Sequence, residues 1–448
     1  MSFEWKKYTI ADVSKKVITG KTPPGTLDKY FGGEVLFVTP TDMGDNKYIE
    51  LTQRTLSDVG EAKLAKQKFE CGIVVSCIGW QMGKAAIVRN TAVTNQQINT
   101  IIPNGDLIDV DFLYYTLSEK RTEIFNLGAT ATRTPILKKS LFERIEFHAP
   151  KLEHQKKISN ILSSLDAKII SNKKINQTLE QMAQALFKSW FVDFEPIKAK
   201  IAVLEAGGSQ EDATLAAMTV ISGKDSDALV VFEREHPEQY AELKATAELF
   251  PSAMQDSELG EIPMGWVSET LGAVLEPKKG KNITKKTIAE GDIPVVAGGL
   301  APAYYHSKCN VTGPVITISA SGANAGFVNL YHCDIWASDC SYINKTQTQF
   351  VYCFYTLLKT RQKEITHMQQ GAAQPHVYPK DIMRLVIVAP ITALWQRLEK
   401  ILTSIYEQIG VHLAQNMCLE SLRDTLLPKL LSGEITLPEA EQIISEEA

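Results

Sequence analysis

The sequence lacks the segments that would place a protein in a membrane or direct it out of the cell. Its 448 residues contain no run of about 18 apolar residues, which a membrane-spanning helix requires. No charged stretch followed by an apolar one opens the chain, so we expect no secretory signal. The seven cysteines are odd in number, scattered and never in C-x-x-C spacing, which favours reduced thiols over a disulfide framework. The expected location is the cytoplasm.

The motifs of nucleotide-binding enzymes are missing as well. Gly20-Lys21-Thr22 resembles the end of a phosphate-binding P-loop, but Lys15 stands where that motif requires a glycine. Pro23-Pro24 would also prevent the helix that must follow. The pair Gly83-Lys84 fails because Ala85 follows it in place of Ser or Thr. Neither segment predicts a nucleotide site.

Catalytic and metal-binding patterns are equally scarce. The sequence has no Asn/Asp-Pro-Pro-aromatic tetrapeptide, no glycine-rich cofactor motif of an amino-methyltransferase and no acidic spacing of a nuclease. His332, Cys333 and Cys340 lie close in sequence, but they lack zinc-ligand spacing and we expect them to be core residues. We therefore predict no catalytic residue and no metal site in this chain.

Charge is unevenly distributed along the chain. Segment 195–262 contains five Lys and Arg against fourteen Asp and Glu, a balance of −9. Because the whole chain carries −5, the remainder carries +4. A basic body with one acidic segment is compatible with binding a polyanion, which the overall charge alone would not suggest.

What the sequence does contain is an internal repeat. At an offset of 240 residues, Tyr115–Leu117 matches Tyr355–Leu357, and the similarity continues without a gap over about eighty residues. Upstream, at an offset near 242, Gly79-x-x-x-Gly83 matches Gly322-x-x-x-Gly326. Short β-rich runs separated by turn signals fill both copies. The repeat predicts two α+β globular units built on one plan.

Each copy ends in a long helical stretch. Leu152–Phe191 has no Pro or Gly, and the second stretch runs from Thr392 to Leu431. Apolar residues of the first recur at helical spacing, forming one stripe: Ile158, Ile161, Leu165, Ile169, Leu179, Met182 and Leu186. A rod with one apolar stripe needs a partner, so we expect the two helices to pair, antiparallel, as a coiled coil.

Polar residues interrupt both helices near their middles. Asn172 is equivalent to His412 in the repeat, and Asn176 is equivalent to Asn416. One interpretation is that these residues lie off the contact face. The other is that they form a central polar layer that fixes the register of the pair at some cost in stability.

Three pairs of equivalent loops differ between the copies while the residues around them agree. The pairs are Gly79–Gln81 with Ser319–Asn324, Thr94–Gln97 with Ala337–Cys340, and Thr132–Pro135 with Ala372–Pro375. This is the pattern expected of two readers of different DNA sequences, because Gln, Asn, Arg and Ser pair with base edges and Lys and Arg meet phosphates. The alternative is ordinary divergence of surface loops.

The chain resembles the specificity subunit of a type I restriction–modification system, and the resemblance covers nearly its whole length. It rests on six segments together: Ala185–Pro196, Leu249–Pro251, Asp256–Trp266, Leu427–Glu434, Pro150 with Gln155, and Pro390 with Gln396. A Gly-Ser-Thr-Gln-Pro-like turn of the family is retained as Gly371–Pro375. It is altered to Ala131–Pro135 in the first copy, so Gln374 matches the family better than Arg133 and Thr134 do.

The resemblance implies an α+β fold with two globular target-recognition domains, related by a pseudo-two-fold and separated by the two long antiparallel helices. The expected layout is a first recognition domain at 1–150, a helix at 151–194, an acidic linker at 195–262, a second recognition domain at 263–390, and a helix with its tail at 391–448. Each domain would read one half of a split, asymmetric DNA site. The helices would set the spacer between the halves and dock two modification (methyltransferase) subunits.

Such a subunit is not itself an enzyme and binds no cofactor. S-adenosylmethionine, ATP and Mg²⁺ would be bound by the partner subunits, including restriction (translocase/nuclease) subunits that join through the complex. The candidate DNA-binding residues are Lys21, Thr41, Gly79, Trp80, Gln81, Lys84, Asn95, Gln96, Arg133, Thr134, Lys281, Gly298, Ser319, Ser321, Asn324, Ser338, Asp339, Gln374 and His376.

Two other functions remain as alternatives. The chain would be a DNA methyltransferase with unrecognised motifs if it transferred methyl groups to DNA by itself. It would be a coiled-coil scaffold without DNA specificity if its complex showed no salt-dependent binding to specific duplexes.

Overall fold

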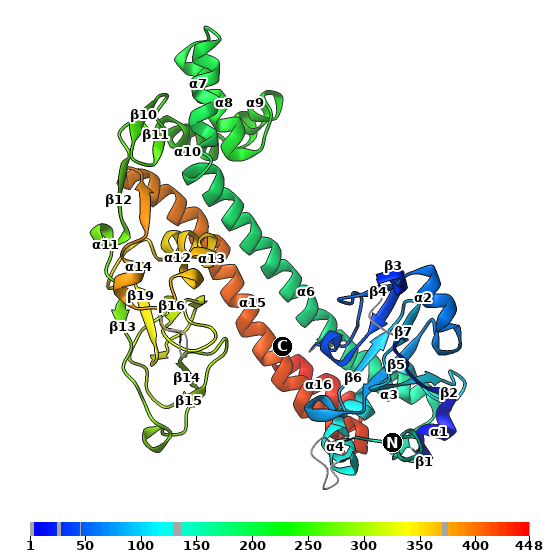
Figure 1. Ribbon diagram of the computed structural model, residues 1–448. Coiled ribbons are helices and arrows are strands. Elements are labelled where there is room, and N and C mark those ends of the chain that lie inside the picture. The colour runs from blue at the N-terminus through cyan, green and yellow to red at the C-terminus, as the bar shows by residue number, and fades with distance from the viewer. Residues whose placement is uncertain (1–3, 25–27, 45, 129–135, 370–374, 448) are drawn as a thin grey trace. The chain divides into compact units, whose positions relative to one another are not determined.

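The structure is a computed structural model that describes residues 4–24, 28–44, 46–128, 136–369 and 375–447. The chain divides into two compact units. The first comprises Met1–Asn172 and Ala414–Ala448, and the second comprises Lys173–Leu413. Each unit therefore contains one globular domain and one half of each long helix (Figure 1).

Two small sheets form the globular domain of the first unit. One is antiparallel, in the order β2 (Ser14–Thr19), β8 (Ile98–Pro103), β5 (Gly72–Ser76), β6 (Ala85–Val88). The other is mixed, in the order β4 (Thr55–Leu56), β3 (Phe31–Val38), β7 (Ala92–Thr94), with β3 and β7 parallel. Successive side chains of a strand point to opposite faces. Ile73 and Val75 of β5 accordingly enter one core cluster, whereas Val74 enters another.

The helical side of this domain connects it to the long helices. Helix α3 (Val110–Glu119) is capped at its N-terminus by Asp109, whose carboxylate accepts from Phe112 N at 2.9 Å. Helix α4 (Arg121–Gly128) follows directly. Strand β1 (Lys6–Thr9) pairs with β9 (Glu146–Ala149), so the two ends of the domain meet. One core cluster joins apolar residues of β5, α3 and both long helices, among them Ile158, Leu165, Leu419 and Leu426.

The second unit repeats this topology strand for strand. Its sheets run β13 (Lys278–Lys279), β19 (Cys340–Asn344), β16 (Val315–Ser319), β17 (Val328–Tyr331) and β15 (Tyr304–His306), β14 (Ile293–Val296), β18 (Trp336–Ala337). Strands β14 and β18 are parallel, as β3 and β7 are, and β12 (Val267–Thr270) pairs with β20 (Val386–Ala389) as β1 pairs with β9. The predicted duplication and the α+β class are both confirmed.

The long helices are α6 (Leu152–Phe191) and α15 (Thr392–Ser432). In the first unit, Asp166 lies 2.9 Å from Arg423 and Asn172 lies 2.9 Å from Asn416, so the residue numbers of the two helices run in opposite directions. In the second unit, Asn176 hydrogen-bonds both His412 and the carbonyl of Ile409. The expected antiparallel pairing is confirmed within each unit.

One member of the predicted stripe lies off it. Met182 is 54% exposed, whereas neighbouring Ala183 is fully buried. The buried face of α6 in the second unit is instead completed by Phe187, Trp190 and Phe191, which form aromatic contacts with Trp266, Phe250 and Trp395. Bulky rings bury more apolar area than a methionine, so they determine which face of the helix turns inward.

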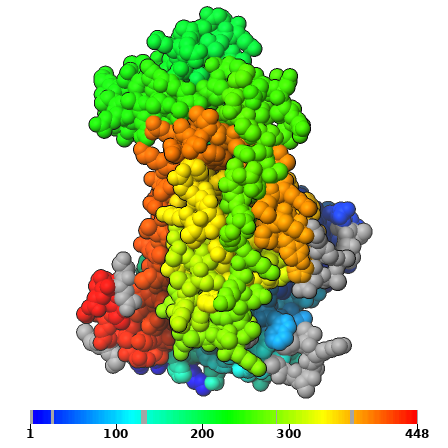
Figure 2. Space-filling model, turned by 90° about the vertical axis from the view of Figure 1, so that its left-hand side faces the viewer, coloured from blue at the N-terminus to red at the C-terminus, as the bar shows by residue number. Residues whose placement is uncertain are grey.

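The acidic linker is more helical than the sequence suggested. Its sequence predicts one or two short helices, around Ser209–Val220 and Pro237–Phe250, but the structure has four: α7 (Glu195–Glu205), α8 (Gln210–Ser222), α9 (Ser226–Glu235) and α10 (Pro237–Glu248). Glu242 of α10 pairs with Arg397 at 3.0 Å and with Lys400 at 2.6 Å, which fixes the module to the beginning of α15. Figure 2 shows these helices in green above the orange start of α15.

Candidate nucleic-acid interface

Loops at one edge of the first domain are held together by backbone hydrogen bonds. Lys21 N donates to Thr94 O at 2.8 Å, and Asn95 N donates to Val38 O at 3.0 Å. Cys77 N donates to Gln97 O at 2.8 Å, and Leu137 N donates to Cys77 O at 2.9 Å. These bonds join the loops that follow β2, β3, β5 and β7 to the segment after residue 135. We call this assembly the first rim.

The second domain has an equivalent set of hydrogen bonds, which defines the second rim. Lys281 N donates to Ala337 O at 2.9 Å, and Ser338 N donates to Val296 O at 2.8 Å. Ala320 N donates to Asp339 O at 3.2 Å, and Val377 N donates to Ala320 O at 3.0 Å. Each bond joins the same two loops as a bond of the first rim. The backbone framework is therefore shared, and only the side chains differ.

One glycine in each rim has no room for a side chain. A Cβ at Gly20 would lie 2.1 Å from Asn95 O, and a Cβ at Gly280 would lie 2.3 Å from Ser338 O. Both distances are far below van der Waals contact. The glycines preceding Lys21 and Lys281 are thus required for the close approach of two loops, which explains why the Gly-Lys pair recurs without forming a P-loop.

Side chains of the first rim are mostly polar. Thr22 Oγ1 lies 2.5 Å from Gln96 Oε1, and Asn95 Nδ2 donates to Gln97 Oε1 at 3.1 Å. Thr41 is exposed, and its hydroxyl lies 2.7 Å from that of Thr39. The loop after β5 adds Trp80, which is 86% exposed, whereas Gln81 is only partly exposed. Donors, acceptors and one large aromatic ring thus share this edge with Lys21.

The second rim gathers a different set of polar groups. The Ser321 hydroxyl donates to the Asp339 carboxylate, and a Cβ at Gly298 would lie 2.6 Å from Ser321 O. His376 forms a β-bridge with Ser321 and stacks on Tyr378, with ring centroids 5.7 Å apart. The second rim therefore carries a carboxylate and an imidazole beside its hydroxyl, whereas the first rim carries amides and an indole beside its hydroxyls.

Several candidates lie beneath the surface of the rims. Ser319 and Ser338 are 4% and 6% exposed, and Asn95 is 9% exposed. Ser338 Oγ accepts from Ile283 N at 3.4 Å, so this side chain supports the loop from below. Arg133, Thr134 and Gln374 lie outside the described residues. The fold brings together the loops that carry the other candidates of each rim, but Lys84 lines a pocket with Tyr115, Asp166 and Arg423.

Sequence reasoning missed three rim residues, Thr22, Gln97 and Tyr378. Thr22 and Gln97 are direct neighbours of Lys21 and Gln96, and they contact other rim side chains. Adjacency to a candidate loop would have been a sufficient signal for both. Tyr378 is recognisable only from its ring contact with His376.

Comparison with known proteins identifies the type of protein. The family described as type I restriction modification DNA specificity domain matches residues 3–181 and 263–419, that is, both halves of the repeat. The specificity subunit of the type I restriction enzyme HindI from Haemophilus influenzae is 30% identical and aligns over 96% of this chain and all of its own length. The chain belongs to this DNA specificity family.

Two further relatives agree with that assignment. The MjaIX specificity subunit of Methanocaldococcus jannaschii is 26% identical over 97% of this chain and 94% of its own length. The crystal structure of a type I restriction–modification S subunit from M. genitalium covers 96% of each chain, with a TM-score of 0.51 and 18% identity, which indicates the same fold. The protein is therefore a type I specificity subunit. Its role is to recognise DNA, and it is not catalytic.

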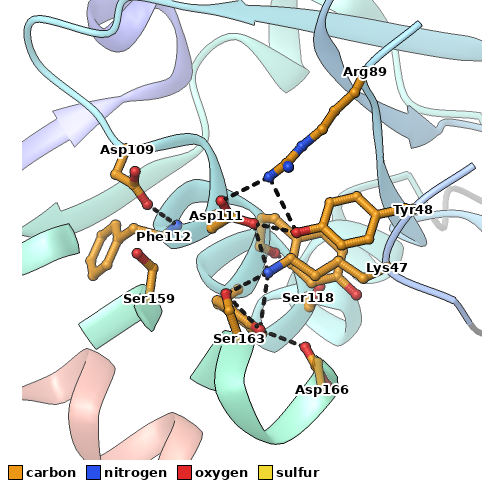
Figure 3. Close-up of polar contacts among 12 residues, drawn as sticks. Lys47, Tyr48, Arg89, Asp109, Asp111, Phe112, Ser118, Ser159, Ser163 and Asp166 are labelled. Carbon is orange, nitrogen blue, oxygen red and sulfur yellow. Dashed lines mark hydrogen bonds and ion pairs between the residues drawn. The ribbon is translucent and has the colours of Figure 1, made fainter. Parts of the chain in front are cut away.

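In this specificity subunit, a buried polar cluster attaches the first domain to the helices (Figure 3). Lys47 is 3% exposed; its ammonium lies 2.6 Å from Asp111 and donates to Ser163 Oγ of α6 at 2.8 Å. It also lies 4.3 Å from the centre of the Tyr115 ring. Tyr115 in turn donates to Asp166 at 2.5 Å, and Asp166 pairs with Arg423 of α15. A single chain of contacts therefore connects the domain with both helices.

Burial controls the ionisation of this cluster. It lowers the pKa of Lys47, an effect that the hydrogen bond and charge of Asp111 oppose. Burial, followed by the charge of Asp111, raises the pKa of Tyr48 to about 12. The same two influences, with Asp166 as the charge, raise the pKa of Tyr115. The tyrosines thus remain neutral hydrogen-bond donors, and Lys47 is retained as a cation by its carboxylate partner.

The second domain contacts α15 differently. A Cβ at Gly410 would lie 2.8 Å from Nδ1 of His332, so the imidazole packs against the bare backbone of the helix. Burial lowers the pKa of His332 to about 4. Cys340 is buried, as expected, but Cys333 is exposed and was wrongly assigned to the core. The described residues contain no group of three or more His, Cys, Asp or Glu placed to hold a metal ion.

No helix in the described part of the chain combines the length and apolar character needed to cross a bilayer.

Proposed function

We propose that the two domains read the two halves of a split, asymmetric DNA site, the first rim contacting one half and the second rim the other. The observation that carries this proposal is the shared backbone of the rims combined with their different side chains. Four equivalent pairs of hydrogen bonds hold the same loops in both domains. Selection for stability alone would not require the side chains to differ, with an indole and several amides in the first rim and a carboxylate and an imidazole in the second.

The chemistry of the rims suits base recognition in the major groove. Amides such as those of Gln81, Gln96 and Asn324 can pair with adenine edges, and Asp339 can accept from the amino group of cytosine. Lys21 and Lys281 lie beside these groups on exposed loops and can meet phosphates, which position a protein without specifying sequence. Because two weak half-site contacts are linked in one chain, together they give one tight interaction.

The helices carry the remaining parts of the proposal. Helices α6 and α15 set the number of unread base pairs between the half-sites, and they dock two methyltransferase subunits. S-adenosylmethionine, ATP and Mg²⁺ are bound by those subunits and by restriction subunits rather than by this chain. The assembly acts in the cytoplasm, where its DNA substrate lies and where thiols such as those of Cys77 and Cys353 stay reduced.

Methylation-sensitive sequencing tests this proposal directly. Host DNA is sequenced with and without this chain, in the presence of its methyltransferase partner. We expect one new methylated motif of two short, different half-sites separated by a constant spacer. Exchange of the second-rim residues Ser321, Asn324 and Asp339 for those of another family member should change one half-site only. A continuous motif, or methylation of both halves altered by that exchange, would contradict the proposal.

A further inference from the structure

Trp80 stands out among the rim residues because it is large, apolar and exposed. Its side chain is 86% exposed, the highest value among large apolar side chains of the described residues. Tryptophan combines a large apolar body with a polar N–H group and is enriched where proteins contact their partners. The surrounding rim is polar and carries Lys21 and Gln96, so the partner that fits it is DNA rather than an apolar protein face.

The indole is held in place before any partner arrives. Its ring is stacked on Phe125 of α4, with centroids 6.0 Å apart and an angle of 20° between the planes. The loop backbone is closed by Met82 N to Gly79 O at 3.1 Å and Gly83 N to Ser76 O at 2.9 Å. Met82 is fully buried and anchors the loop in the core. A fixed aromatic ring loses little conformational entropy when it binds.

The second rim has the same loop without the ring. Ala325 N donates to Gly322 O at 3.0 Å, and Gly326 N donates to Ser319 O at 2.8 Å. Gly79 and Gly83 have φ of 64° and 82°, and Gly322 and Gly326 have φ of 81° and 82°. These are left-handed values that favour glycine. Ala323 occupies the position of Trp80. One backbone thus presents an indole in the first domain and a methyl group in the second.

We propose that Trp80 reads a thymine in the first half-site through apolar contact with its 5-methyl group. The inference rests on the proposed function of the first rim. The thymine methyl is the apolar feature of the major-groove edge, and apolar side chains recognise it by van der Waals contact. The amide groups of the rim lack such an apolar surface, so the large ring has a task that the base-reading amides cannot perform.

Replacing thymine by uracil removes only that methyl group, so it tests the inference without disturbing base pairing. Duplexes carrying the cognate site are made with uracil at one thymine position at a time, and their binding by the assembled complex is measured. One position in the first half-site should lose about fourfold in affinity, the value of one buried methylene-sized group. Trp80→Ala should bind the unmodified site about tenfold more weakly and respond equally to thymine and uracil at that position.

Controls separate this effect from others. Trp80→Phe should retain the response to uracil, and Ala323→Trp should leave it unchanged because that residue faces the second half-site. Uracil sensitivity that persists in Trp80→Ala, or is absent from the unmodified protein, would overturn the inference. So would a rise in 2-aminopurine fluorescence that depends on Trp80, which indicates insertion between bases. Loss of methyltransferase binding in Trp80→Ala would assign the ring to a protein contact instead.

Failure of the underlying function has its own signature. If the unmodified complex does not distinguish its cognate site from unrelated DNA, the proposed function fails together with the inference. If it distinguishes them but no uracil effect depends on Trp80, the inference alone fails.

Discussion

Asn172 donates from its side-chain amide to Oδ1 of Asn416, 2.9 Å away across the two long helices. In the repeat, Asn172 is equivalent to His412 and Asn416 to Asn176. In the second unit, Nδ1 of His412 lies 2.7 Å from Oδ1 of Asn176. Asn172 and Asn416 are 0% and 4% exposed, so they lie on the contact face of the helices and not beside it. The interpretation that these polar residues lie off the contact face is therefore wrong. That they fix the register of the helix pair stays a prediction.

Replacing both Asn172 and Asn416 by Leu should cost less stability than replacing either residue alone. Either single replacement should lower the free energy of unfolding by about 1–3 kcal/mol, because the remaining buried amide loses the hydrogen bond between the two side chains. The double replacement should recover that loss, since apolar pairs tolerate burial better. Chemical denaturation of the unmodified protein, the two single variants and the double variant measures the coupling, with exposed Met417→Ala as the control. If the losses from the two single replacements simply added up in the double variant, the predicted coupling would be contradicted.

Lys47→Met should destabilise the first domain because half-buried Asp111 would lose its shorter ion pair, at 2.6 Å, and keep only the 3.4 Å contact with Arg89. The expected loss in free energy of unfolding is about 3 kcal/mol. Adding Asp111→Asn should restore part of it by removing the charge that has lost its buried partner. The matched control is Lys7→Met, whose ion pair with Glu146 is 57% exposed on both sides and should be worth less than about 1 kcal/mol. Equal losses from Lys47→Met and Lys7→Met would contradict the expectation.

His332 should make the second unit less stable as pH falls from about 6.5 to about 4. Burial lowers the pKa of His332 to about 4, so in this window the unfolded chain binds a proton that the folded chain does not. Stability is fully present above pH 6.5 and is lost as the pH falls towards 4, by roughly 3 kcal/mol in total. Thermal unfolding from pH 7 to 4.5 measures it. His332→Gln should flatten the pH dependence, whereas exposed His367→Gln should not.

Lengthening both long helices should change the spacer of the recognised site. Four residues inserted at equivalent places of the repeat, after Lys168 of α6 and after Gln408 of α15, add about 6 Å to each helix. The preferred spacer should lengthen or recognition should be lost, as read by methylation-sensitive sequencing. Four residues inserted in the turn at Gly207, between α7 and α8, should leave the spacer unchanged. An unchanged spacer in the variant with lengthened helices would refute the role of α6 and α15 in setting the spacer.

The spacing of residues along the sequence was sufficient to predict the long helix and the two repeated domains. The bounds of α6 agree with the predicted Leu152–Phe191, because a long stretch without Pro or Gly and with apolar residues at helical spacing has few alternatives. The recurrence at 240 residues likewise predicted two domains of one plan, and the strands of both domains pair identically. The missing catalytic motifs and the family segments together predicted a DNA specificity subunit.

Tertiary structure decided what depends on residues distant in the chain. No local pattern connects Lys47 with Asp111, Ser163 and Tyr115, because their contact exists only once the domain packs on α6. The same holds for Asn95 and Ser338, whose polar character suggested DNA contact but whose burial makes them loop supports. The sequence determined the elements and their duplication through short-range periodicity. Packing determined which polar side chains face solvent, because burial is a property of the assembled surfaces.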